Sequence, residues 1–139
     1  MAPPLPWRSF APIQPDDDYV VTTTRLPLRH HRHIPAVMGA TMRIARELAR
    51  SHGLVGYSLH AQLVHKTFWT MSVWQTRHDL ERFVRSDVHR TAMASIGPHM
   101  ERPRIQTTTV RGVHLPPPWV DAHRELTSDE PGLVESSPP

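Results

Sequence analysis

One stretch of eight residues decides the fold of this chain: Thr67-Phe68-Trp69-Thr70-Met71-Ser72-Val73-Trp74. Aromatic and β-branched residues of this density are typical of a β-strand. Successive side chains of a strand point to opposite faces, so Trp69, Met71 and Val73 share one face. Phe68, Thr70, Ser72 and Trp74 share the other. Because both faces carry large side chains, the stretch is expected to be a central strand with a layer packed on each side.

The segments on either side of this strand alternate between strand and helix patterns. Before it we expect a strand at 19–26, an amphipathic helix that begins at Ile34, and a second strand at 55–63, with Gly53 as the C-cap of the helix. After it, the capping-box pattern from Thr76 to Asp79 opens a helix. Ser86 offers a second N-cap, so this helix is expected to break and restart before a last strand at 104–110.

This order, β-α-β-β-α-β, is that of the ferredoxin-like α+β plan. It predicts a four-stranded antiparallel sheet with two helices on one face. The Thr runs at 22–24 and 107–109 are expected on adjacent strands. The helix-free face of the sheet needs a cover, and a second copy of the chain provides one. We therefore expect a homodimer in which two sheets face each other as an α/β barrel.

Proline and charge divide the chain into three parts. Residues 1–18 are expected to form a Pro-rich, loosely packed arm, 19–112 one folded domain, and 113–139 a Pro-rich acidic tail that is partly disordered and in which Trp119 is an anchor. The domain holds 14 of the 16 Lys and Arg residues but 5 of the 13 Asp and Glu residues. Because the aromatic residues do not alternate with these cations, nucleic acid is not an expected partner.

Several classes of protein are disfavoured by composition. The chain has no Cys, which removes disulfides, thiolate metal sites and a Cys nucleophile. It has no long apolar run and no signal-peptide pattern, so a cytoplasmic protein without a membrane span is expected. No Gly-rich phosphate loop is present. The run Arg29-His30-His31-Arg32-His33 is interpreted as a basic loop, because adjacent residues do not converge on a metal and the Arg side chains repel one.

The strand with the pattern Trp-Thr-x-Ser-x-Trp, followed by a capped helix and then Ser86-Asp87-Val88-His89-Arg90, resembles the antibiotic biosynthesis and haem-degrading monooxygenases of the dimeric α/β-barrel superfamily. The resemblance implies a small-molecule enzyme. Two positions depart from the family pattern. Ser72 stands where many members have Glu, and Met93 stands where the haem-degrading branch has its proximal His, with His89 one turn earlier. If haem is bound, the resemblance implies His89 or Met93 as its ligand.

The candidate catalytic residues are two histidines, each of which has a plain structural interpretation as well. His60 lies on the polar face of its strand with Ser58 and Gln62, and serves as a general base if that face turns toward the helices. His89 follows a helix N-cap and is expected near the open end of a cavity, with Arg90 beside it. Trp69 and Trp74 point to opposite faces, so one is core and the other a stacking wall for a planar ligand. Thr70 and Ser72 complete the predicted substrate-binding set.

The sequence leaves four functions open. The first is cofactor-independent oxygenation of a hydrophobic aromatic or polyketide-like metabolite, in which a His base generates an electron-rich anion that reduces O2. A cyclase or isomerase would use the same pocket without O2. A haem protein and a non-catalytic ligand-binding module are the other two, and no catalytic motif in the sequence excludes the last.

Overall fold

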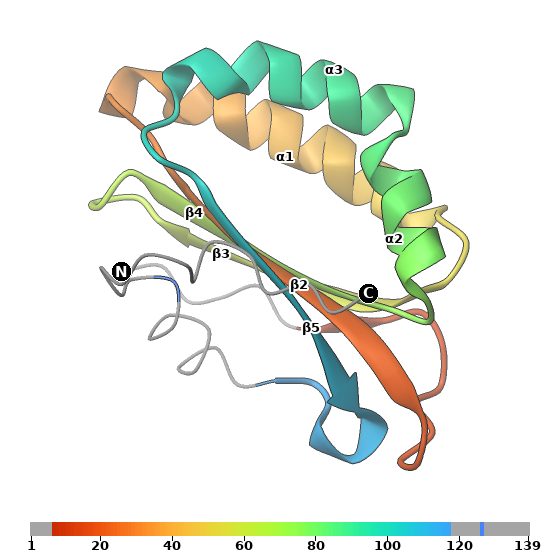
Figure 1. Ribbon diagram of the computed structural model, residues 1–139. Helices are drawn as coiled ribbons and strands as arrows, with labels where there is room; N and C mark the ends of the chain where they lie inside the picture. Colours follow the sequence, from red (N-terminus) through yellow and green to blue (C-terminus); the bar gives the residue numbers. More distant parts are fainter. Residues whose placement is uncertain (1–6, 118–125, 127–139) are drawn as a thin grey trace.

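The computed structural model describes residues 7–117 and 126, which form a single sheet covered on one face by helices (Figure 1). The antiparallel sheet has the order β1-β3-β4-β2-β5. Its strands are β1 Arg8–Ser9, β2 Asp18–Pro27, β3 Leu54–Gln62, β4 Thr67–Trp74 and β5 Arg104–Arg111. The helices are α1 Ile34–Ala49, α2 Arg77–Val84 and α3 Asp87–Ile96, all on the same side of the sheet.

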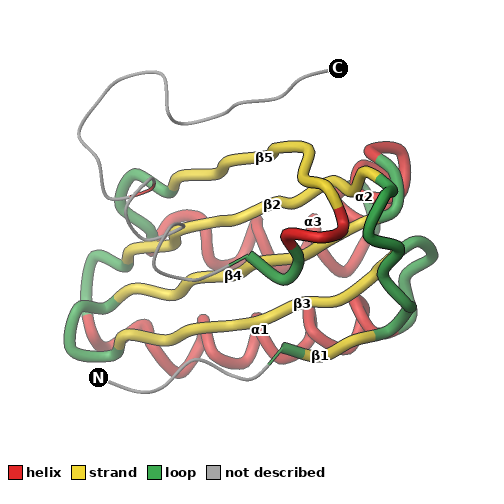
Figure 2. The backbone as a smooth tube through the Cα atoms, turned by 90° about the horizontal axis from the view of Figure 1, so that it is seen from below, coloured by secondary structure: helices red, strands yellow, loops and turns green. Residues whose placement is uncertain are grey.

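The predicted ferredoxin-like fold is confirmed, and β4 is its central strand. Strand β4 pairs with β2 from Val20 opposite Trp74 to Pro27 opposite Thr67, and with β3 on its other edge. The Thr-rich strands β2 and β5 are neighbours, as expected. Thr22 lies opposite Thr107, and their hydroxyl oxygens are 2.7 Å apart. Figure 2 shows the strands of the sheet side by side with the helices behind them.

The prediction of four strands is corrected by one short strand from the N-terminal arm. Arg8 and Ser9 pair with Tyr57 and Gly56 of β3, and the Phe10 N–H donates to the Val55 carbonyl at 2.8 Å. An edge strand exposes a row of unpaired backbone groups, and a few residues of the arm satisfy part of that row. Residues 8–10 of the arm therefore extend the sheet at the edge of β3.

The break in the second helical segment is confirmed, because two capped helices replace one. The Thr76 hydroxyl accepts from the Asp79 N–H at 3.1 Å to begin α2, and the Ser86 hydroxyl accepts from the His89 N–H at 3.2 Å to begin α3. Gly53 was expected as the C-cap of α1, but that helix ends at Ala49. Gly53 instead takes a φ of +84° in the loop just before β3.

The helix-free face of the sheet is apolar and partly covered by the chain itself. Its buried cluster contains Tyr19, Val21, Val55, Met71 and Val73, against which Trp7, Ile13, Val110 and Leu115 pack. Pairing of this face with a second copy stays a prediction. Trp119 and the rest of the tail beyond residue 117, apart from Leu126, lie outside the described residues.

Within the part of the chain that the structure describes, no helix has the length and apolar character needed to cross a membrane.

Replacing Gly53 by Ala is expected to destabilise the fold by about 2 kcal/mol or more, because the positive φ disfavours a Cβ. That Cβ would also lie 2.2 Å from the Asp79 carboxyl carbon, inside the cap of α2. Urea unfolding measures the change. Gly97→Ala is the control, since a Cβ there meets nothing within 4 Å, and its effect should stay within about 0.5 kcal/mol. Equal effects of the two substitutions would contradict this assignment.

Candidate functional site

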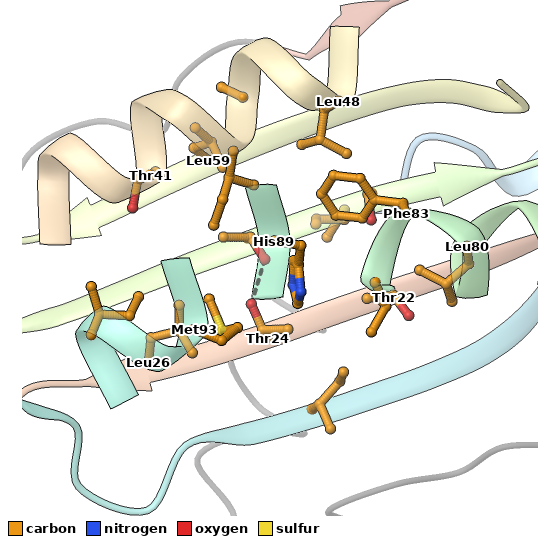
Figure 3. A pocket seen from close by; sticks show the side chains of 18 residues that line it. Thr22, Thr24, Leu26, Thr41, Leu48, Leu59, Leu80, Phe83, His89 and Met93 are labelled. Carbon is orange, nitrogen blue, oxygen red and sulfur yellow. Dashed lines mark hydrogen bonds between the residues drawn. The ribbon is translucent and has the colours of Figure 1, made fainter. Parts of the chain in front are cut away.

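A cavity of about 140 Å³ lies between the sheet and the three helices (Figure 3). It occupies the space between two packed clusters of the core. One cluster is centred on Leu48, Trp74 and Phe83, and the other on Val37, Phe68 and Ile96, while Ile44 contacts both. Most of the lining is apolar. The lining residues are Thr22, Thr24, Leu26, Thr41, Ile44, Ala45, Leu48, Leu59, Thr70, Met71, Ser72, Leu80, Phe83, Val84, His89, Met93, Ile96 and Ile105.

The sheet side of the cavity is a floor of hydroxyl groups on the two central strands. Thr24 of β2 and Thr70 of β4 lie opposite each other, and their hydroxyls are hydrogen-bonded. The Ser72 hydroxyl accepts from the Trp74 indole N–H at 2.9 Å. A hydroxyl has one donor and two acceptor positions, so these groups retain capacity for a ligand. The floor can therefore orient a polar atom of an otherwise apolar molecule.

His89 is the only titratable side chain that lines this cavity in the described part of the chain. It projects from the first turn of α3 toward the floor, and the edge of its ring meets Phe83, with ring centroids 5.1 Å apart (Figure 3). Burial lowers the pKa of His89, and a hydrogen bond to the backbone of Val84 opposes that shift. In a neutral imidazole one nitrogen donates a hydrogen bond and the other accepts one. Because one nitrogen of His89 donates to the backbone of Val84, the other nitrogen is the acceptor.

Four of the residues predicted from the sequence meet at this cavity: Thr70, Ser72, His89 and Met93. Trp74 does not line it. Its side chain is fully buried and packs against Phe83, with ring centroids 5.4 Å apart. Arg90 is exposed on the outside of α3 and does not line the cavity either. The site therefore gathers His89, the hydroxyl floor and Met93, and leaves Trp74 as core.

Ser58, His60, Gln62 and Trp69 lie on the opposite face of the sheet. The expectation that the polar side of β3 turns toward the helices is wrong, because Tyr57 and Leu59 pack into the core beneath α1 and α2. An amphipathic helix buries its apolar stripe against apolar partners, so the apolar row of β3 faces inward. On the outer face the Trp69 indole N–H donates to Gln62 at 2.8 Å, and His60 lies opposite Trp69. A catalytic role for His60 on that face stays a prediction.

Sequence reasoning missed several lining residues. Thr22 and Thr24 were recognised as strand residues, and their alternation with Val21 and Thr23 was a usable signal that they share one face. Thr41 of α1 is buried among apolar residues, and only the packing of α1 places it beside the cavity. Phe83 of α2 belongs to the core and also provides the aromatic wall next to His89.

Haem does not fit this cavity. His89 and Met93 both line it, as a haem site at these residues would require. Its volume of about 140 Å³ is nevertheless below the roughly 300–1,000 Å³ of pockets that hold drug-sized ligands, and haem is larger than most of these. Hemin added to the protein is therefore expected to leave its Soret band unshifted.

The shifted pKa of His89 predicts a pH dependence of stability. The folded pKa is below the ordinary value of about 6.5 that the unfolded chain retains. Between the two values the unfolded chain binds more protons, so stability falls as the pH drops below about 6.5 and levels off below the folded pKa. Urea unfolding between pH 8 and 5 should show a smaller loss of stability in His89→Gln than in the wild type. His78→Gln, at an exposed position on α2, should keep the wild-type slope, and equal slopes in all three proteins would contradict the prediction.

Solved structures with the same architecture come from several organisms. No family model and no curated protein matches the chain. A "Putative antibiotic biosynthesis monooxygenase" from Nitrosomonas europaea is 17% identical over 71% of this chain and 92% of its own, with a TM-score of 0.60. SnoaB, a cofactor-independent oxygenase from Streptomyces nogalater, is 18% identical over 71% of this chain and 98% of its own, with a TM-score of 0.55. A conserved protein from Methanosarcina mazei Go1 is 12% identical over 67% of this chain and 91% of its own, with a TM-score of 0.57. The chain therefore has the ferredoxin-like fold of the antibiotic biosynthesis monooxygenase-like proteins.

Proposed function

We propose that this protein is a small-molecule oxygenase that needs no cofactor and acts on a hydrophobic phenol or enol, with His89 as the general base. The observation that carries the proposal is the position of His89. It is the one titratable side chain at a largely apolar cavity, among the residues that the structure describes. The likeness to SnoaB, which is described as a cofactor-independent oxygenase, supports the same chemistry.

The environment of His89 suits proton abstraction near neutral pH. Burial lowers the pKa of His89, so the ring is neutral and able to accept a proton. Val84, at the carboxyl end of α2, makes the backbone hydrogen bond, and Phe83 fixes the plane of the ring from the side. The opposite wall of the cavity carries the hydroxyls of Thr24, Thr70 and Ser72. A substrate hydroxyl placed between His89 and this floor can lose its proton to the imidazole, while the floor stabilises the oxyanion.

The oxidation balances without a further reductant. Removal of the phenolic proton makes the ring electron-rich enough to donate electrons to O2. Oxidation of the para carbon then converts the phenol and one O2 into a quinone and one water, because one oxygen atom enters the ring and the other takes up two hydrogens. The apolar lining keeps bulk water from the anion.

Two other functions use the same residues. A cyclase or isomerase would begin with the same proton transfer to His89 and would consume no O2. A binding module would place a ligand in the cavity without turnover. Measurement of O2 uptake beside ligand binding separates all three.

The decisive experiment is O2 uptake by the purified protein with a panel of phenols whose para position is free, with correction for autoxidation. The wild type is expected to consume O2 and form the quinone. His89→Gln is expected to lower the rate by about 100-fold or more, as loss of a general base does. His60→Gln is the informative comparison, because His60 lies on the other face of the sheet.

Three outcomes are distinguishable. A large loss of O2 uptake in His89→Gln, with O2 uptake retained in His60→Gln, supports the proposal. A large loss in His60→Gln alone would move the base to the outer face and overturn the assignment to His89. Ligand binding without O2 uptake would exclude the oxygenase and leave the isomerase or binding module. His78→Gln, on the exposed side of α2, controls for nonspecific effects of losing an imidazole.

A further inference from the structure

The cavity continues into a second hollow at the edge of the sheet. A groove of about 330 Å³ lies between α2 and β5, and it shares Thr22, Leu80, Val84 and Ile105 with the cavity. Val84 and Ile105 are unusually exposed for apolar residues, at 40% and 41%. Strand β5 is the edge strand of the sheet. The shared residues therefore make the groove an entrance to the cavity, with Val84 and Ile105 at its two sides.

The entrance differs from the cavity in that it carries charge. Arg77 and Glu81 of α2, and Arg85 directly after this helix, line the groove, whereas the cavity has no Lys, Arg, Asp or Glu in its lining. The Arg77 Nε lies 3.6 Å from a Glu81 carboxylate oxygen, so these two charges largely offset each other. Within the described residues no ion pair involves Arg85, and its side chain is exposed. One positive charge is therefore left at the entrance.

The size of the cavity limits what lies beside His89. A dry engineered cavity of about 150 Å³ accepts one benzene molecule, so a cavity of about 140 Å³ matches a single aromatic ring. Fused polycyclic molecules require more room than this. A further part of a substrate can extend into the groove at α2 and β5, which adjoins the cavity and carries charge.

We propose that the substrate is a single-ring hydroxylated aromatic acid, whose ring lies beside His89 and whose carboxylate lies in the α2–β5 groove against Arg85. This assignment rests on the proposed function for the role of the ring hydroxyl, and on the two adjoining hollows for the shape and charge of the ligand. Arg85 is a specificity-determining residue in this arrangement. Arg recognises carboxylates with paired N–H donors, and an exposed site limits the gain to a few-fold.

The test is equilibrium binding, measured by calorimetry without turnover under anaerobic conditions. The probes are 3-hydroxyphenyl alkanoic acids of increasing chain length, in which the carbon para to the hydroxyl is free, their methyl esters, and phenol and naphthol as ring-size probes. At low salt the best acid should bind about threefold to fivefold tighter than its ester, and the preference should fall as salt is raised. Phenol should bind more tightly than naphthol, because the second ring exceeds the cavity.

Arg85→Gln should abolish the preference for the acid over its ester and leave the affinity for the ester unchanged. Arg82→Gln is the matched control, since Arg82 is an exposed cation of α2 that contacts His78 and does not line the groove. The proposal is overturned if acid and ester bind alike, if Arg85→Gln keeps the preference, if naphthol binds more tightly than phenol, or if none of the probes binds.

These outcomes can be distinguished from failure of the proposed oxygenase function. Binding of the acid with the Arg85-dependent preference, but without O2 uptake, would retain the ligand class and remove the oxygenation. O2 uptake with neutral phenols, without any preference for acids, would retain the oxygenase and remove the role of Arg85.

Discussion

Strand β4 is hydrogen-bonded on both edges along its whole length, and the rest of the structure depends on this pairing. A strand sends alternate side chains to opposite faces, and a shift of one residue in register would move every side chain to the other face. The register places Thr70 and Ser72 beneath the helices and Val73 on the outer face. The register of β4 therefore produces both the polar floor of the cavity and the apolar outer face of the sheet.

The cavity exists because the helices do not fill the space above that floor. Small hydroxyl residues on β2 and β4 occupy positions where larger apolar side chains would have joined the two core clusters. A closed, dry void of about 140 Å³ would cost about 3 kcal/mol, at the rate found for cavities left in protein cores. A ligand that fills the cavity removes that cost.

His89 owes its position to the break between α2 and α3. Helix α2 ends at Val84, and the Ser86 cap begins α3. His89 therefore lies in the first turn of α3, beside the last turn of α2. This junction supplies the backbone group of Val84 and the ring of Phe83 that hold the imidazole. In a single unbroken helix, neither the backbone of Val84 nor the ring of Phe83 would contact the imidazole of His89. The break also leaves Arg85, between the helices, at the entrance to the cavity.

The sequence by itself determined the order of the elements, the central place of Thr67–Trp74, the break at Ser86 and the opposite directions of Trp69 and Trp74, because each follows from local periodicity or capping. It also named His89, which follows a cap, and His60 as the two candidate bases, without deciding between them. Only the tertiary structure decided which face of β3 meets the helices, since alternation separates two faces but does not say which is covered. Long-range packing alone joined Thr24, Thr70, Phe83 and His89 around one cavity, and pairing of backbone groups at an exposed edge brought Arg8 and Ser9 into the sheet. These contacts link residues far apart in the chain, and no local pattern encodes them.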